Sequence, residues 1–178
     1  NQRLSGCNSG YTGTTTINGG KLIVNGVLPT VSLVGVDSGG QLSGNGRVGA
    51  VVVGSGGSTY PGDPQILTAA SITYQAGSSA IFAIETDSAV SPLAGTHYDR
   101  INITSQTSGA LTIEEGAALG LNFTTDSLAY LQNQGEGYAS ANYFLFTTTG
   151  TGTTSGGLRC LTIHQGGNSY THTNHEKG

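Results

Sequence analysis

The fold is decided by a short unit that recurs along the first third of the chain. Residues 16–26 read TINGGKLIVNG, residues 36–46 read VDSGGQLSGNG, and residues 51–57 read VVVGSGG. Their glycine pairs begin at positions 19, 39 and 56, which are steps of 20 and 17 residues. Repeats of this period, with short apolar-alternating runs between glycines, are typical of a solenoid whose units bury their inward side chains by stacking. The pattern therefore predicts an all-β protein, a single-stack parallel β-helix.

Weaker copies continue the rhythm. Residues 72–77 and 111–116 resemble the unit. Strand patterns are found at 66–67, 71–75, 80–85, 98–104, 110–114, 118–123 and 142–147. We expect three parts: residues 1–13 as a partial or frayed N-terminal edge, 14–163 as the β-helix, and 164–178 as a polar C-terminal tail. Prolines at 61 and 64 mark a corner or loop at 58–64. A short helix is expected only at 126–134.

The composition limits the function classes. The 178 residues include 30 glycines, only 9% are charged, and the formal net charge is −4. The six Lys and Arg residues are scattered, whereas nucleic-acid binding needs a clustered basic face. No stretch approaches the roughly 18 consecutive apolar residues of a transmembrane helix. We therefore expect neither a nucleic-acid partner nor a membrane span in this segment.

The two cysteines lie near opposite ends of the chain. In a stack with strands about 4.8 Å apart, Cys7 and Cys160 would be separated by roughly 30 Å, and a disulfide needs Cα atoms within about 7 Å. The sequence predicts no bridge between them.

No set of residues has the spacing of a catalytic or metal site. His164, His172 and His175 lie in a Gly- and Ser-rich terminus that supplies no rigid frame, so we interpret them as part of the solvated tail rather than as zinc ligands. The glycine turns lack the Asp of calcium-binding nonapeptides, and no Ser-His-Asp arrangement can be argued from spacing. We expect no catalytic residue, no metal and no cofactor.

Two alternatives remain open. Residues in neighbouring units of a stack can lie close together, so Asp99 could meet Glu114 or Glu115. A carbohydrate-active enzyme would require such a pair of carboxylates on one face. The acids are otherwise spread along the chain, and exposed strand ends are the ordinary expectation for all six: Glu85, Asp87, Asp99, Glu114, Glu115 and Asp126. Tyrosine rings offer flat faces for sugar stacking, although core and rim packing explains most of them equally well. These are Tyr60, Tyr74, Tyr98, Tyr130, Tyr138, Tyr143 and Tyr170.

The order of the motifs resembles a known family. The run 18–26, then SGGQLSGNGRVG at 38–49, then 53–57 with Tyr60-Pro61-Gly62, is similar to the passenger-associated repeat of bacterial autotransporters and related surface proteins. The runs 98–104 and 142–146 are also similar to the strands that follow in such proteins. This sequence departs from the pattern at Tyr60, where the repeat usually has a smaller residue.

The resemblance implies a right-handed parallel β-helix that is secreted or displayed at a bacterial cell surface. In autotransporters this region is thought to help passenger folding and secretion. We therefore expect a structural segment, a stalk and folding scaffold, that is not an enzyme and lies outside the cell or on its surface. The alternative is an adhesin or glycan-binding module that uses a lateral face, with a host or matrix glycan or protein as its partner.

Overall fold

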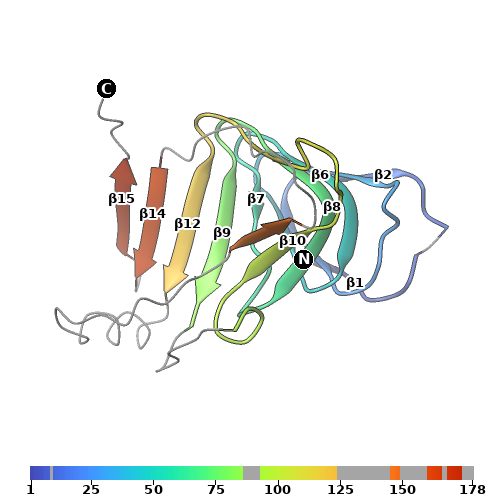
Figure 1. The fold of residues 1–178 in the computed structure, drawn as a ribbon, viewed down its shortest axis with the longest axis horizontal. Helices are drawn as coiled ribbons and strands as arrows, with labels where there is room; N and C mark the ends of the chain where they lie inside the picture. The colour runs from blue at the N-terminus through green and yellow to red at the C-terminus, as the bar shows by residue number, and fades with distance from the viewer. Residues whose placement is uncertain (9, 86–92, 124–144, 149–159, 166–167, 174–178) are drawn as a thin grey trace.

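The computed structural model describes residues 1–8, 10–85, 93–123, 145–148, 160–165 and 168–173, with only the backbone described from 160 onward. In these ranges the regular structure consists of β-strands alone, as the sequence predicted. The strands form two sheets (Figure 1).

The first sheet, sheet A, has eight strands in the order β1-β3-β5-β7-β9-β12-β14-β15. Their bounds are Gln2–Leu4, Gly20–Val24, Gly40–Ser43, Ser58–Thr59, Ser79–Ile84, Ala118–Phe123, Cys160–Gln165 and Asn168–Thr173. Neighbouring strands pair in parallel except β14 and β15, which are antiparallel.

The second sheet, sheet B, follows the order β13-β10-β8-β6-β4-β2, and β11 also pairs with β8. The strands are β2 (Thr14–Ile17), β4 (Leu33–Val36), β6 (Arg47–Val53), β8 (Ile66–Tyr74), β10 (Arg100–Ile103), β11 (Leu111–Ile113) and β13 (Phe146–Thr148). All of these pairings are parallel.

From β1 to β10 the chain alternates between the two sheets. We call a strand of sheet B and the following strand of sheet A a layer; the layers are β2–β3, β4–β5, β6–β7, β8–β9 and β11–β12. Because the strands pair in register, equivalent side chains line up across layers. One inward column of sheet B contains Ile17, Val36, Val53, Tyr74 and Ile113.

The inward residues form one hydrophobic core between the sheets. Alternation in each strand turns every second side chain inward, and Val36, Val53 and Phe82 are completely buried. A polar pair within this core is satisfied, because the hydroxyls of Thr59 and Tyr74 lie 2.7 Å apart in a hydrogen bond. Phe146 packs edge-to-face on Phe82, with 5.1 Å between ring centroids.

The turns between the sheets repeat the same geometry. Turns beginning at Asp37, Gly54, Gln75 and Glu114 each close with a hydrogen bond from the fourth residue's N–H to the first residue's carbonyl, at 2.8–3.1 Å. The third residue is always a glycine with φ between 76° and 89°, which a type II turn requires. The N–H groups of Gly39, Gly56 and Gly77 also donate to the carbonyls of the next layer, at Gly56, Gly77 and Gly116, and the Gly20 N–H donates to the Gly39 carbonyl, all at 2.9–3.0 Å. We call this row of bonds the turn ladder.

Strand β8 turns a corner of the molecule without a break. Its buried residues are Leu67 and Ala69 in the first half but Ile72 and Tyr74 in the second, so the inward phase shifts by one residue at 70–71. The first half pairs with β10 and the second with β11. The sequence predicted two strands, at 66–67 and 71–75, because the phase shift resembles a gap between them.

The two ends of the chain contain strands that the sequence did not predict. Strand β1 lies within the expected frayed edge at 1–13 and pairs with β3. Strand β15 lies within the expected polar tail at 164–178, and it pairs with β14 over six residues. The helix expected at 126–134 lies outside the described residues.

Cys7 is exposed and carries a free thiol. Cys160 begins β14, which is six strands away from β1 in sheet A. At the spacing of neighbouring strands, this places the two backbones about 29 Å apart, far beyond disulfide range.

Candidate functional site

The most unusual ionisable group in the described structure is Asp99, immediately before β10. Its side chain has no exposed surface. Oδ1 accepts a hydrogen bond from the Gln65 N–H at 2.6 Å, and Oδ2 accepts from the N–H groups of Ala83 at 2.8 Å and Gly62 at 3.4 Å. The carboxylate therefore joins the loop between β7 and β8 to the end of β9.

Burial dominates the electrostatics of Asp99. It raises the pKa of the carboxyl from 3.8 to about 6, although the three amide donors lower it, and the nearby Asp63 carboxylate adds a further increase. Desolvation penalises the charged form, whereas N–H donors favour it. Asp99 is thus a carboxylate that the fold holds at an electrostatic cost.

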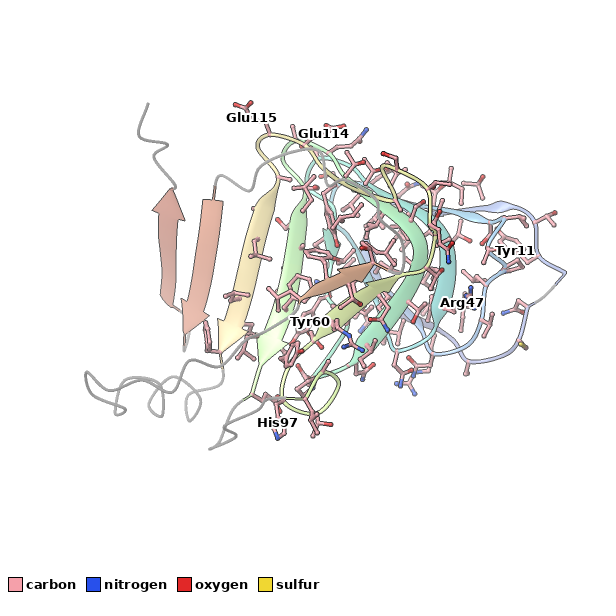
Figure 2. The ribbon with its side chains drawn as sticks, viewed as in Figure 1. Tyr11, Arg47, Tyr60, His97, Glu114 and Glu115 are labelled. Atoms are coloured by element: carbon pink, nitrogen blue, oxygen red, sulfur yellow. The ribbon has the colours of Figure 1, made fainter. Side chains whose placement is uncertain are left out.

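Tyr60 lies on the same loop and gathers three polar side chains. Its hydroxyl donates to Asp63 Oδ1 and also bonds with the Asn122 side chain. The Lys21 ammonium lies 5.3 Å from the ring centroid, within the range of a cation–π interaction. Partial burial and the bond to Asp63 raise the pKa of Tyr60 above its usual value. We call Lys21, Tyr60, Asp63 and Asn122 the Tyr60 cluster; Figure 2 shows Tyr60 far from Glu114 and Glu115.

The geometry assigns Asp99 a structural role. A general base or nucleophile must reach a reacting atom, but the Asp99 oxygens are enclosed and already bonded to backbone amides. The sequence-based expectation of acids at exposed strand ends is therefore wrong for Asp99. Asp99 is buried because the loop at 60–65 folds over it, and the residues next to Asp99 in the sequence give no sign of that contact.

The structure does not bring Asp99 together with Glu114 or Glu115. Asp99 contacts Ala83 near the end of β9, whereas the Glu114 turn bonds to Gly77 just before that strand begins. Six residues of extended chain separate the two places by about 20 Å. Glu114 instead accepts a hydrogen bond from the Ala76 N–H at 3.2 Å. The convergence left open by the sequence is thus absent for these three acids, while Asp87 and Asp126 lie outside the described residues.

The histidines of the C-terminal segment are placed only in part. His164 lies on β14 opposite Ser169, and His172 lies on β15 opposite Leu161. His175 lies outside the described residues. In the part of the chain that the structure describes, no group of three or more His, Cys, Asp or Glu side chains is arranged to hold a metal ion.

The tyrosines expected as candidates for a sugar platform are divided between core and surface. Tyr74 and Tyr98 are buried, so they present no ring face to a ligand. Tyr60 remains at the surface in its cluster. Tyr170 lies on β15, and Tyr130, Tyr138 and Tyr143 lie outside the described residues. Sequence reasoning missed the partners of Tyr60, and the only signal for them was the turn-forming run at 60–64.

Comparison with known proteins adds no relative. A scan against protein-family models, a search of curated proteins and a search of solved structures each returned no match. The described residues also contain no helix that is long and apolar enough to cross a bilayer.

Proposed function

We propose that this chain is a structural segment, a stalk and folding scaffold, of a secreted or surface-displayed bacterial protein of the autotransporter type. In this proposal the layers form a right-handed, single-stack parallel β-helix, and the segment acts mechanically rather than as an enzyme. Its place is outside the cell or on the cell surface.

The turn ladder carries the proposal. The same turn, with the same glycine conformation, recurs at Gly39, Gly56, Gly77 and Gly116, and the first three of these glycines bond to the layer before and to the layer after. A unit that satisfies its backbone through the unit before and the unit after is suited to extending a stack. The scarcity of charged residues and the closed environment of Asp99 also favour a structural role.

Removal of one complete layer tests the proposal. Val36 and Val53 are register partners, so deletion of residues 37–53 joins Val36 to Gly54 in an equivalent environment. We expect this variant to unfold cooperatively within a few degrees of the parent. Its longest dimension in small-angle X-ray scattering should shrink by about 5 Å, one strand spacing.

Deletion of residues 37–45 provides the control. It removes only about half as many residues, but it removes β5 and keeps β6, so the chain returns to the same sheet without crossing to the other. We expect this smaller deletion to abolish cooperative unfolding. Equal damage from both deletions would contradict a stacked scaffold.

A second candidate function, glycan binding on a lateral face, is favoured by the Tyr60 cluster. The cluster combines an aromatic ring with an ammonium, a carboxylate and an amide on the outside of sheet A. Such a combination suits a sugar, whose apolar face stacks on the ring while its hydroxyls bond to the polar groups.

Glycan-array binding of the parent and of Tyr60→Ala tests this candidate. We expect loss of at least about 90% of the bound signal, more than 1 kcal/mol of binding energy. Thr73→Ala, an outward position on β8 in the other sheet, should retain binding. Absence of any bound glycan, or equal binding by both variants, would exclude the candidate without affecting the scaffold proposal.

A further inference from the structure

The chain contains one reactive dipeptide in three places. Asparagine is followed by glycine at 18–19, 25–26 and 45–46, and all three asparagine side chains are exposed. In such a dipeptide the glycine nitrogen can attack the side-chain amide of the asparagine, because glycine has no Cβ to hinder the approach. The attack needs a glycine N–H that donates to no acceptor and a backbone that is free to turn. The fold therefore decides which of the three copies can react.

Two of the copies are held by the sheets. The Gly26 N–H donates to the Leu4 carbonyl at 3.0 Å, and the Gly46 N–H donates to the Val24 carbonyl at 2.8 Å. The backbone is also closely packed at both places. A Cβ at Gly26 would lie 2.1 Å from the Gly6 carbonyl oxygen, and a Cβ at Gly46 would lie 2.2 Å from the Gly26 carbonyl oxygen. Either nitrogen can attack only after its layer opens locally, which costs free energy.

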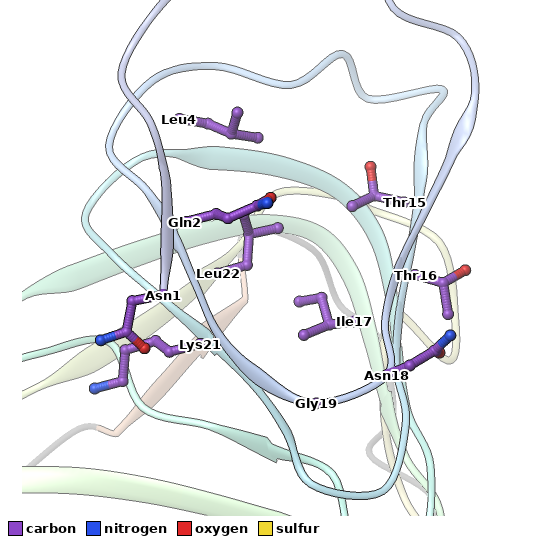
Figure 3. Close-up of a pocket in the computed structure, with 10 residues that line it drawn as sticks. All are labelled: Asn1, Gln2, Leu4, Thr15, Thr16, Ile17, Asn18, Gly19, Lys21 and Leu22. Carbon is purple, nitrogen blue, oxygen red and sulfur yellow. The ribbon is translucent and has the colours of Figure 1, made fainter.

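The third copy lies in the turn that joins β2 to β3 (Figure 3). In this turn the bond of the turn ladder is made by the following residue, because the Gly20 N–H donates to the Gly39 carbonyl at 2.9 Å. The Gly19 N–H has no acceptor among the residues that the structure describes. Ser38 and Ser55, which precede the next two ladder glycines, likewise have no acceptor for their N–H groups within the described ranges. The free N–H is thus a property of this position in the turn.

Asn18 places a suitable electrophile beside the free N–H. It stands two residues before its ladder glycine, where the next two layers have Asp37 and Gly54. A carboxylate resists nucleophilic attack, and glycine has no side chain to be attacked. The position after it has room for the reaction, since Ser38 and Ser55 carry side chains there.

We propose that Asn18-Gly19 is a modification site, at which the folded chain converts Asn18 spontaneously to aspartate and isoaspartate while the copies at 25–26 and 45–46 are protected. Hydroxide takes the Gly19 N–H proton, the nitrogen bonds to Asn18 Cγ, and the Cγ–Nδ2 bond breaks. Ammonia leaves with a proton from water, which restores the hydroxide and leaves a succinimide. Water then opens the succinimide at either carbonyl, which gives aspartate or isoaspartate and lowers the formal net charge of −4 by one.

Peptide mapping by mass spectrometry tests the assignment, with the folded parent and the parent in concentrated urea incubated at the same mildly alkaline pH. In the folded protein we expect Asn18 to convert at least about tenfold faster than Asn25 or Asn45, because the other two sites must open first. In urea the three rates should converge, since the dipeptide is the same. Isoaspartate should accompany aspartate at Asn18, because direct hydrolysis of the amide would give aspartate alone.

Asn18→Gln is the matched variant. It keeps an amide at this position, but attack by the Gly19 nitrogen would have to close a six-membered ring in place of a five-membered one. We expect conversion at position 18 to be lost and the rates at Asn25 and Asn45 to stay unchanged. The inference would be overturned by equal rates at the three asparagines of the folded parent, by aspartate without isoaspartate, or by an Asn18 that stays intact while the unfolded chain reacts.

Discussion

At the scale of single residues, Asp99 is the position where chemistry and burial conflict most strongly. A carboxylate with no exposed surface is uncommon unless it is bonded, and here three amides from two segments supply the bonds. Both oxygens accept, so the site suits a carboxylate better than the isosteric amide of Asn. Asp99 thus stabilises one loop geometry while leaving the fold sensitive to pH.

The raised pKa of Asp99 predicts that the protein is more stable in mild acid. Between pH 3.8 and about pH 6 the folded state binds a proton that the unfolded state has released. Protonation of Asp99 in the folded state therefore adds to the free energy of unfolding. This added stability is fully present below 3.8, the pKa of Asp99 in the unfolded state, and is lost as pH rises through about 6. A difference of this size corresponds to at most about 3 kcal/mol. Urea unfolding of the parent and of Asp99→Asn between pH 4 and pH 7.5 measures it.

The difference in free energy of unfolding between the parent and Asp99→Asn isolates the contribution of Asp99, because the other carboxyls titrate in both proteins. We expect the stability of the parent relative to Asp99→Asn to decline as pH rises. Asp37→Asn, which changes an exposed acid in a turn, should keep the full dependence of the parent. A parental slope that persists in Asp99→Asn would show that another group causes it.

At the scale of elements, β6 and β8 both bend where their buried positions shift by one residue, and each bend has a small residue. In β6 the buried positions shift from Val48 to Val51 and Val53, so the strand changes phase beside Gly49. A Cβ at Gly49 would lie 2.0 Å from the Ser32 carbonyl oxygen. The following strand has Ala70 at the equivalent corner, between the register pairs formed by Ala69 and Ser71.

Gly49→Ala should therefore destabilise the protein by about 3 kcal/mol, because a backbone segment must move to admit one methyl group. Ala70→Gly at the neighbouring corner should cost only about 1 kcal/mol, through backbone entropy. Chemical denaturation of the two variants makes the comparison. Similar losses in both would mean that the approach to Ser32 relaxes without penalty.

Strands such as β12 could be predicted from the sequence because apolar and polar residues alternate in them without a shift. The limits of β12 agree with the predicted strand at 118–123, and the turn glycines were recognised from their spacing. The continuity of β8 was not predictable, because a bent strand and two short strands have the same inward pattern. Strands β1 and β15 escaped prediction because their sequences, QRL and NSYTHT, contain too few apolar residues for a period-two signal.

At the scale of the whole molecule, the sequence predicted the all-β class and parallel strands, and the structure confirms both. Repetition made this prediction possible, because the same pattern of glycines and alternating apolar residues recurs in successive layers. The Tyr60 cluster and the buried Asp99 could not be predicted, because they join residues far apart in the sequence, such as Tyr60 with Asn122 and Gly62 with Asp99, through a loop that does not repeat. The stacked architecture and the cell-surface role remain proposals.

The turn ladder also gives the molecule an electrical axis. All its N–H groups point toward the Glu114 turn, and the carbonyls that accept them face Gly20. Peptide dipoles aligned in this way add, as they do in a helix, leaving partial positive charge at one extremity and partial negative charge at the other. Glu114 and Glu115 sit at the positive extremity, while Lys21 directly follows Gly20 at the negative one. Of the few charged residues in this chain, these three therefore counterbalance the polarity of its own backbone.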